Sequence, residues 1–365
     1  MCVFSAASPP KKHTLVLFEA ATGGLKKNIL FRTRSLAVYL WRKIKKTQSM
    51  HDPIPETEMP PESYPPPKLV VFSLAAVSFL CAVLGSGIVY LACQAQGLDV
   101  QEAINSFGAG SSLDERNFMR GVLLLNHMTT FLLPAMLVGW FFYRRQWPQN
   151  LCVATAPPAA TLAWGFLFIA AAFPLAQVAF DLNRWMVEQI PLLKSLVEME
   201  NAAESMMTGL LVMDSPGEVL FSILVMAAVP AIGEEMLFRG VLQQHLVRWM
   251  KRPAAAILLT ALIFGLAHFE VQRFFAIFLL GVALGLLFYW TQNLWVPIAA
   301  HFLNNATQVV VAYFYQDELE KLNQGGGDSL PPLVAVASFA LVLWVGKILR
   351  DRHQRSIDHP QNTTP

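Results

Sequence analysis

The sequence is poor in charged residues and rich in apolar ones. Only 14% of its 365 residues are Asp, Glu, Lys or Arg, and 55% are hydrophobic. A typical soluble domain has about 25% charged residues, so this composition indicates an integral membrane protein. The four cysteines show no CxxC or other metal-ligand spacing, and no redox or cysteine metal site is predicted. Apart from a basic N-terminal tail, nothing in the sequence favours binding to nucleic acid.

Eight apolar runs are long enough, or nearly long enough, to cross a bilayer, which predicts an all-α bundle of about eight transmembrane helices. Their approximate ranges are 69–93, 121–143, 159–180, 219–240, 254–269, 274–290, 295–315 and 333–349. If both termini are cytoplasmic, the inner segments hold 20 of the 27 lysines and arginines, and the outer segments hold 6. This asymmetry favours a multi-pass protein with both termini inside. If the source is bacterial, the expected location is the inner, or plasma, membrane.

The sequence predicts three regions. Residues 1–67 form a basic and then proline-rich tail and linker, residues 68–350 form the membrane domain, and residues 351–365 form a C-terminal tail. Two interpretations of residues 1–49 stay open. Either residues 28–41 form a basic amphipathic helix on the membrane surface, or residues 1–49 are an over-extended start and Met50 is the true first residue.

The fourth apolar run contains the charged residues Glu234, Glu235 and Arg239. A charged side chain near the bilayer centre costs roughly 2.5–3.5 kcal/mol to insert. Glu235 and Arg239 are four residues apart and can pair on one helix face, whereas Glu234 points about 100° away from Glu235. Pro230 removes a backbone donor and is expected to kink this helix. Such a charged membrane helix predicts a functional site.

Other polar groups lie in neighbouring runs. His268 ends the fifth run, and His301 and Asn305 share a helix face in the seventh. If the fourth and fifth runs form an antiparallel hairpin, Glu234 and His268 lie at the same depth in the membrane. Straight helices place His301 closer to the cytoplasm, so helix tilt, the kink or a late helix start must close that gap. His127 stands alone in the second run and is interpreted as structural.

Two carboxylates, two imidazoles and a carboxamide in one pocket predict hydrolysis. Burial disfavours the charged form of a carboxylate, which makes it a stronger base, and a neighbouring histidine can share a water with it. A histidine and an asparagine on one helix face can donate hydrogen bonds to a developing oxyanion. The favoured reaction is therefore hydrolysis of a carbonyl compound, and of a peptide bond above all.

Three motifs, in this order, resemble those of the CPBP family of type II CAAX prenyl proteases and bacteriocin-processing or abortive-infection proteins. They are E-E-x-x-x-R at Glu234, Glu235 and Arg239, F-x-x-x-H at Phe264 and His268, and H-x-x-x-N at His301 and Asn305. The resemblance covers residues 217–315, the predicted protease core. It leaves residues 1–120 without a motif.

The resemblance implies an intramembrane glutamic endopeptidase that acts on membrane-associated or hydrophobic peptide or protein substrates. Glu234 and His268 would activate the water, and His301 and Asn305 would form the oxyanion hole. No cofactor or metal is implied. The residues that would support the site are Glu235, Arg239 and Phe264.

Several alternatives stay open. The two glutamates could form only a structural ion pair with Arg239, and His268 and His301 could be hydrogen-bonded core residues. Zinc could be held by His268, His301 and a glutamate, although the helical HExxH pair is absent. The chain could also be a non-catalytic membrane scaffold or immunity factor, or a transporter with a Glu/His proton relay. The expected partners are the lipid bilayer and the substrate, and the oligomeric state is left open.

Overall fold

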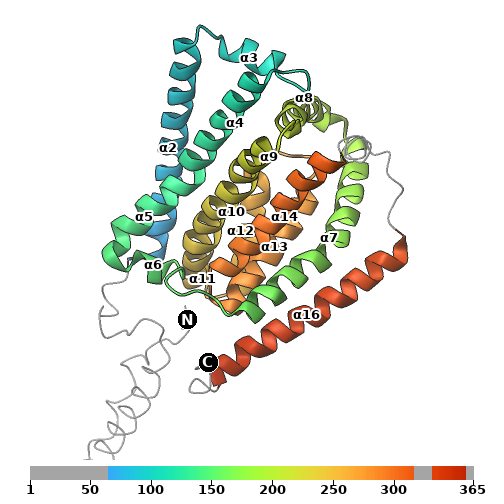
Figure 1. The fold of residues 1–365 in the computed structure, drawn as a ribbon. Helices are drawn as coiled ribbons and strands as arrows, with labels where there is room; N and C mark the ends of the chain where they lie inside the picture. Colours follow the sequence, from blue (N-terminus) through green and yellow to red (C-terminus); the bar gives the residue numbers. More distant parts are fainter. Residues whose placement is uncertain (1–64, 316–330, 359–365) are drawn as a thin grey trace, which may run out of the picture. The chain divides into compact units, whose positions relative to one another are not determined.

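The computed structural model describes residues 65–315 and 331–358, and every regular element in these ranges is a helix (Figure 1). The predicted all-α class is thus confirmed for the described residues. The interpretations of residues 1–49 lie outside them. The α-helices are α2 (Pro67–Ala95), α3 (Val100–Ser106), α4 (Leu113–His127), α5 (Leu133–Tyr143), α6 (Trp147–Asn150), α7 (Ala159–Glu188), α8 (Lys194–Leu211), α9 (Pro216–Ile223), α10 (Val229–Glu235), α11 (Gln244–Met250), α12 (Pro253–Ala267), α13 (Phe274–Thr291), α14 (Trp295–Phe314) and α16 (Pro332–Asp358).

All eight predicted runs fall on helices, and within the described ranges six helices are long and apolar enough to cross a membrane. These six are Pro67–Ala95, Leu113–Asn150, Ala159–Glu188, Pro216–Met250, Phe274–Thr291 and Pro332–Asp358. The helix α12 is apolar but has only 15 residues. The 20-residue α14 is a continuous helix, but polar side chains such as His301, Asn304 and Asn305 lower the apolar character of its sequence. The protein is therefore an integral membrane protein, while the count of eight and the side on which each terminus lies remain predictions.

The fourth span, Pro216–Met250, is one continuous helical segment. Its α-helices alternate with two π-helical stretches, η5 (Leu224–Ala228) and η6 (Met236–Gln243). The side chain of Ser215 caps its start by accepting a hydrogen bond from the N–H of Glu218. Both carboxylates of the E-E motif lie at the end of α10, between the two π-helical stretches.

A π-helical stretch lies at the position where the sequence predicts a kink. Pro230 has no N–H and cannot continue the α-helical hydrogen-bond ladder. Directly before it, the N–H of Val229 donates to the carbonyl of Leu224, five residues back. This wider pairing keeps the segment helical through the proline.

The helix α13 runs parallel to the fourth span. Arg239 Nη2 donates to the carbonyl oxygen of Gly281 at 2.9 Å, and Gln243 Nε2 donates to that of Gly285 at 3.0 Å. From the first of these hydrogen bonds to the second, the donor and the acceptor each move four residues toward the C-terminus, so the two helices run in the same direction. A Cβ atom at Gly285 would lie 2.7 Å from Gln243 Oε1 and 3.0 Å from Ile257 Cγ2, so at least the Gln243 side chain would have to shift to make room for it.

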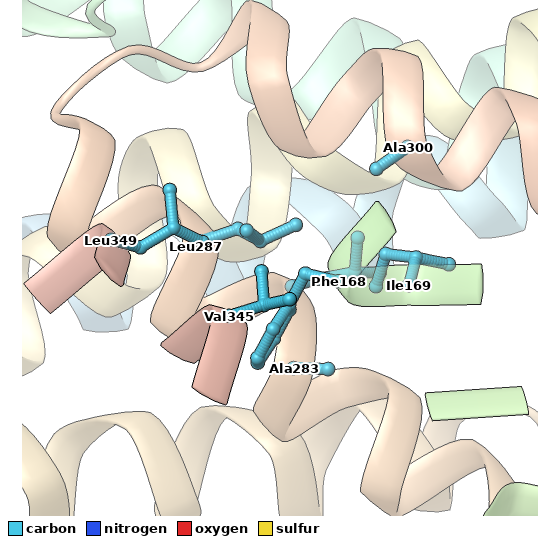
Figure 2. Close-up of a cluster of buried hydrophobic side chains, with 8 residues drawn as sticks. Phe168, Ile169, Ala283, Leu287, Ala300, Val345 and Leu349 are labelled. Carbon is cyan, nitrogen blue, oxygen red and sulfur yellow. The ribbon is translucent and has the colours of Figure 1, made fainter. Parts of the chain in front are cut away.

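A hydrophobic cluster joins α7, α13, α14 and α16 (Figure 2). Phe168 and Ile169 of α7 pack with residues of α13, and Ala300 contributes from α14. Because Ala300 directly precedes His301, this packing also sets the rotation of α14 that turns His301 toward the fourth span. The remaining members of the cluster are Ala283, Leu284, Leu287, Val345 and Leu349.

Candidate active site

The two adjacent glutamates at the end of α10 have different surroundings. Both are buried: Glu234 is 4% exposed and Glu235 is fully enclosed. Glu235 Oε1 accepts a hydrogen bond from Arg239 Nη1. The same oxygen lies 2.9 Å from His301 Nδ1. Glu234 Oε2 is buried and has no hydrogen-bond partner among the described residues. The neighbours of Glu234 Oε2 are imidazole nitrogens that stand just outside hydrogen-bond distance.

Arg239 links Glu235 to two other elements. Its guanidinium is fully buried, donates to Gly281 of α13, and lies 4.6 Å from the centre of the Phe264 ring of α12. Burying an ion costs several kcal/mol, and a buried ion offsets this cost only with a close counter-charge and further hydrogen bonds. Arg239 has all of these, together with a cation–π contact. The predicted pairing of Glu235 with Arg239 is therefore present and holds three helices together.

His268 is placed by the end of α12. It follows the last residue of the helix, and its Nδ1 lies 2.8 Å from the carbonyl oxygen of Phe264, one turn back. A carbonyl only accepts, so Nδ1 carries the hydrogen and Nε2 of the neutral ring is an acceptor. This Nε2 lies 3.9 Å from Glu234 Oε2.

His301 reaches the depth of Glu234 because the turn before α14 lies beside the middle of the fourth span. A Cβ atom at Gly240 would be 3.2 Å from Leu294 Cδ2, so these two residues are at one level. Glu234 lies six residues before Gly240, and His301 lies seven residues after Leu294. Since the two helices are antiparallel, both side chains arrive at the same height. His301 Nε2 lies 4.0 Å from Glu234 Oε2, and the gap expected from straight helices is closed.

Phe264 forms a wall of this site. It is fully buried and packs edge-on against Phe238, with ring centres 5.1 Å apart. Its ring centre is also 4.6 Å from that of His268 and 6.1 Å from that of His301. The F-x-x-x-H spacing thus places an aromatic ring against both imidazoles and fixes their orientation.

Asn305 lies one turn after His301 on α14 and is partly buried. Its Oδ1 accepts a hydrogen bond from Asn304 Nδ2 at 3.1 Å, which leaves its own amide hydrogens available. The structure places it on the same helix face as His301. Its role toward a substrate stays a prediction.

The distances from Glu234 Oε2 to its imidazole neighbours suit a shared water molecule. Separations of 3.9 and 4.0 Å are too long for a direct hydrogen bond, but a water at about 2.8 Å from both atoms spans them. Glu234 Oε2 and neutral His268 Nε2 are both acceptors. A water between them would donate one hydrogen to each and present an oxygen lone pair to a substrate. The site is more open on the side of His268, whose side chain is 27% exposed, against 5% for Glu234.

Residues 216–307 match the family described as Type II CAAX prenyl endopeptidase Rce1-like. This segment is of the CPBP family. The resemblance inferred from the three motifs is thereby confirmed over about a quarter of the chain, and all of the motif residues lie within the match. Members of this family are generally peptidases. The CPBP segment thus carries the fold of a CAAX-type intramembrane protease.

A relative shares part of this segment. Over 80 residues, the chain is 41% identical to the uncharacterized protein YpbD of Bacillus subtilis (strain 168). The match covers 21% of this chain and 38% of the length of that relative. No solved structure matches the chain.

One residue outside the CPBP segment also faces Glu234. His127 Nδ1, at the end of α4, lies 3.8 Å from Glu234 Oε1. From the sequence alone His127 is interpreted as structural, because a single histidine in an apolar run has no spacing partner that indicates a site. Only the spatial arrangement of the second and fourth spans brings it to the carboxylate.

No group of three or more His, Cys, Asp or Glu side chains in the described ranges is arranged to hold a metal ion. If the site held zinc, its ligands would be His268, His301 and a glutamate. In the structure, His301 Nδ1 is engaged by Glu235 and His268 Nδ1 by the Phe264 carbonyl, so each of these two histidines faces Glu234 through its Nε2 atom alone. That the reaction needs no metal remains a prediction for a chelator experiment.

Proposed function

We propose that this protein is an intramembrane endopeptidase that hydrolyses peptide bonds with a water activated by Glu234 and His268. The observation that carries the proposal is the buried, unpartnered Glu234 Oε2, which faces the Nε2 atoms of His268 and His301 at 3.9 and 4.0 Å. A structural carboxylate in an apolar interior would be expected to have hydrogen-bond partners. Because Glu235 Oε2 is also buried without a partner among the described residues, it is the two imidazole nitrogens facing Glu234 Oε2 that single out Glu234 as the carboxylate that binds a reacting water.

In the proposed reaction, Glu234 takes a proton from the water while the water oxygen attacks the scissile carbonyl carbon. The carbonyl oxygen becomes an oxyanion, which accepts hydrogen bonds from His301 and Asn305. Glu234 then gives the proton to the amide nitrogen, the C–N bond breaks, and a carboxylic acid and an amine leave. Each water that is consumed supplies one oxygen and two hydrogens to the two products.

Glu235 and Arg239 would act on this reaction through His301. Because His301 Nδ1 donates to Glu235, the ring donates from Nε2 toward an oxyanion only as an imidazolium. Glu235 is the counter-charge beside that cation, and Arg239 fixes the carboxylate in place. The pair would therefore hold His301 in the orientation that the oxyanion requires.

The expected substrate is a membrane-anchored or hydrophobic peptide. The site residues lie among membrane-spanning helices, so a substrate segment must enter an apolar environment to reach them. The sequence predicts that cleavage takes place toward the cytoplasmic half of the bilayer. If the source is bacterial, the substrate is not expected to carry a prenyl group.

The test compares the membrane peptides of cells that carry the wild-type protein with those of cells that carry Glu234→Gln. The substitution keeps the size of the side chain and removes the base. Cleavage products that are present with the wild type should disappear, and intact precursors should accumulate, at equal protein levels. Full biological activity of Glu234→Gln would favour the membrane-scaffold alternative.

A further inference from the structure

His127 occupies a position at the candidate site that the matched family segment does not include. It ends α4 and presents Nδ1 to Glu234 Oε1 at 3.8 Å, the oxygen opposite to that faced by His268 and His301. Nδ1 is buried and has no hydrogen-bond partner among the described residues. The three imidazoles therefore divide between the two oxygens of one carboxylate, two on Oε2 and one on Oε1.

The fold brings the His127 segment into direct contact with the helix that carries Glu234. After His127 the chain continues as the π-helical stretch η2 (Met128–Leu132). A Cβ atom at Gly233 would lie only 3.1 Å from the backbone nitrogen of Leu132, so the approach of η2 to α10 depends on the glycine next to Glu234. This is a backbone contact, which a side-chain rotation cannot relax.

Aromatic packing fixes the direction of the His127 ring. It stacks on Phe131, with centres 5.6 Å apart and planes at 30°, and Phe131 packs on Phe238 at 6.1 Å. Phe238 in turn packs on Phe264, the ring that orients the other two histidines. One aromatic row thus links all three imidazoles around Glu234.

We propose that His127 is a positioning residue of this site, with its Nδ1–H holding Glu234 Oε1 so that Oε2 stays directed at the water shared with His268. The inference rests on the proposed peptidase function. A carboxylate bonded on one oxygen cannot rotate freely, and the other oxygen keeps its place relative to the water. The required movement is small, since 3.8 Å is about 1 Å longer than a hydrogen bond.

Two substitutions separate this role from simple packing. His127→Asn loses the ring but keeps an N–H at the position of Nδ1, because both atoms are bonded to Cγ. His127→Phe keeps a ring to stack on Phe131 but has no nitrogen. The kcat and KM of both variants are measured on the purified full chain in lipid nanodiscs, with a library of internally quenched apolar peptides as the probe.

The proposal predicts that His127→Phe lowers kcat by about 10- to 100-fold with little change in KM, a size typical of residues that orient a reacting group. His127→Asn should retain at least about tenfold more of the wild-type kcat than His127→Phe. Equal kcat values in the two variants, whether both high or both low, would overturn the proposal, as would a higher value for His127→Phe. Glu234→Gln serves as the reference: if it still cleaves, the peptidase function itself fails. If it is inactive while His127→Phe is fully active, only the role of His127 fails.

Discussion

Arg239 donates a hydrogen bond to the backbone of Gly281, 42 residues further along the chain, at a distance of 2.9 Å. Its other terminal nitrogen donates to Glu235, and the whole side chain is enclosed. The fourth span is therefore attached to α13 by a charge that water does not reach. The same charge neutralises the carboxylate that orients His301, so the stability of the bundle and the geometry of the site depend on one residue.

Replacing Arg239 by Met should destabilise the protein strongly. Glu235 would stay buried without its counter-charge, and breaking a buried pair in this way costs about 3–5 kcal/mol. The measurement is the thermal unfolding midpoint of the detergent-solubilised protein. The double variant Glu235→Gln with Arg239→Met should recover part of the loss, because a neutral amide costs less to bury than a carboxylate. A single variant as stable as the wild type would contradict the structural role of the pair.

Replacing Gly233 by Ala should separate η2 from α10. The added Cβ would stand 3.1 Å from Leu132 N and 3.2 Å from Leu132 Cβ, so the backbone must move by a few tenths of an ångström. Overpacking of this kind costs about 1–3 kcal/mol, and here it also withdraws His127 from Glu234. Both the unfolding midpoint and kcat should fall.

The matched control is Gly87→Ala on α2, where an added Cβ would meet nothing within 4 Å. It should leave both quantities unchanged. If Gly233→Ala behaves like this control, the close contact between η2 and α10 is not required for the site.

The helical runs and the residues of the site could largely be predicted from the sequence. Long apolar runs mark membrane helices because a bilayer requires them, and polar groups inside such runs mark functional sites. The structure indeed brings the Nε2 atoms of His268 and His301 to 3.9 and 4.0 Å from Glu234 Oε2. Whether each of these residues has its predicted chemical role stays a prediction.

Other features could not be predicted from the sequence. The π-helical stretches at Leu224–Ala228 and Met236–Gln243 depend on backbone pairing that a 3.6-residue hydrophobic period does not report. The depth of His301 depends on a packing contact between Gly240 and Leu294, residues that belong to no common motif. The approach of His127 depends on how the second span packs against the fourth. The positions of His301 and His127 are therefore properties of tertiary contacts.

Replacing Asn305 by Leu should lower kcat with a smaller effect on KM. Loss of one hydrogen-bond donor from an oxyanion hole typically costs about 100- to 1,000-fold in kcat. The control is Gln308→Leu, the same type of change at an exposed position on α14, which should leave kcat unchanged. Both are measured on the quenched peptide library in nanodiscs. Equal kcat values for the two variants would mean that Asn305 takes no part in the reaction.

Metal chelators should leave cleavage unchanged. In the proposed reaction Glu234 and His268 activate the water, with no metal-bound hydroxide. Purified protein is treated with 1,10-phenanthroline or EDTA, and initial rates on the peptide library are compared with untreated protein. Strong inhibition that added zinc reverses would show that a metal takes part, and His268, His301 and Glu234 would then have to be considered as its ligands.

Activation of the water by Glu234 is tested by the rate of peptide cleavage by Glu234→Gln, with Glu198→Gln as the control. The two substitutions make the same chemical change, one at the buried carboxylate and one at an exposed position on α8. Both purified variants, in nanodiscs and folded to the same extent, are assayed with the quenched peptide library. Glu198→Gln is expected to cleave like the wild type, and Glu234→Gln is expected not to cleave. Cleavage by Glu234→Gln at the wild-type rate would contradict activation of the water by Glu234.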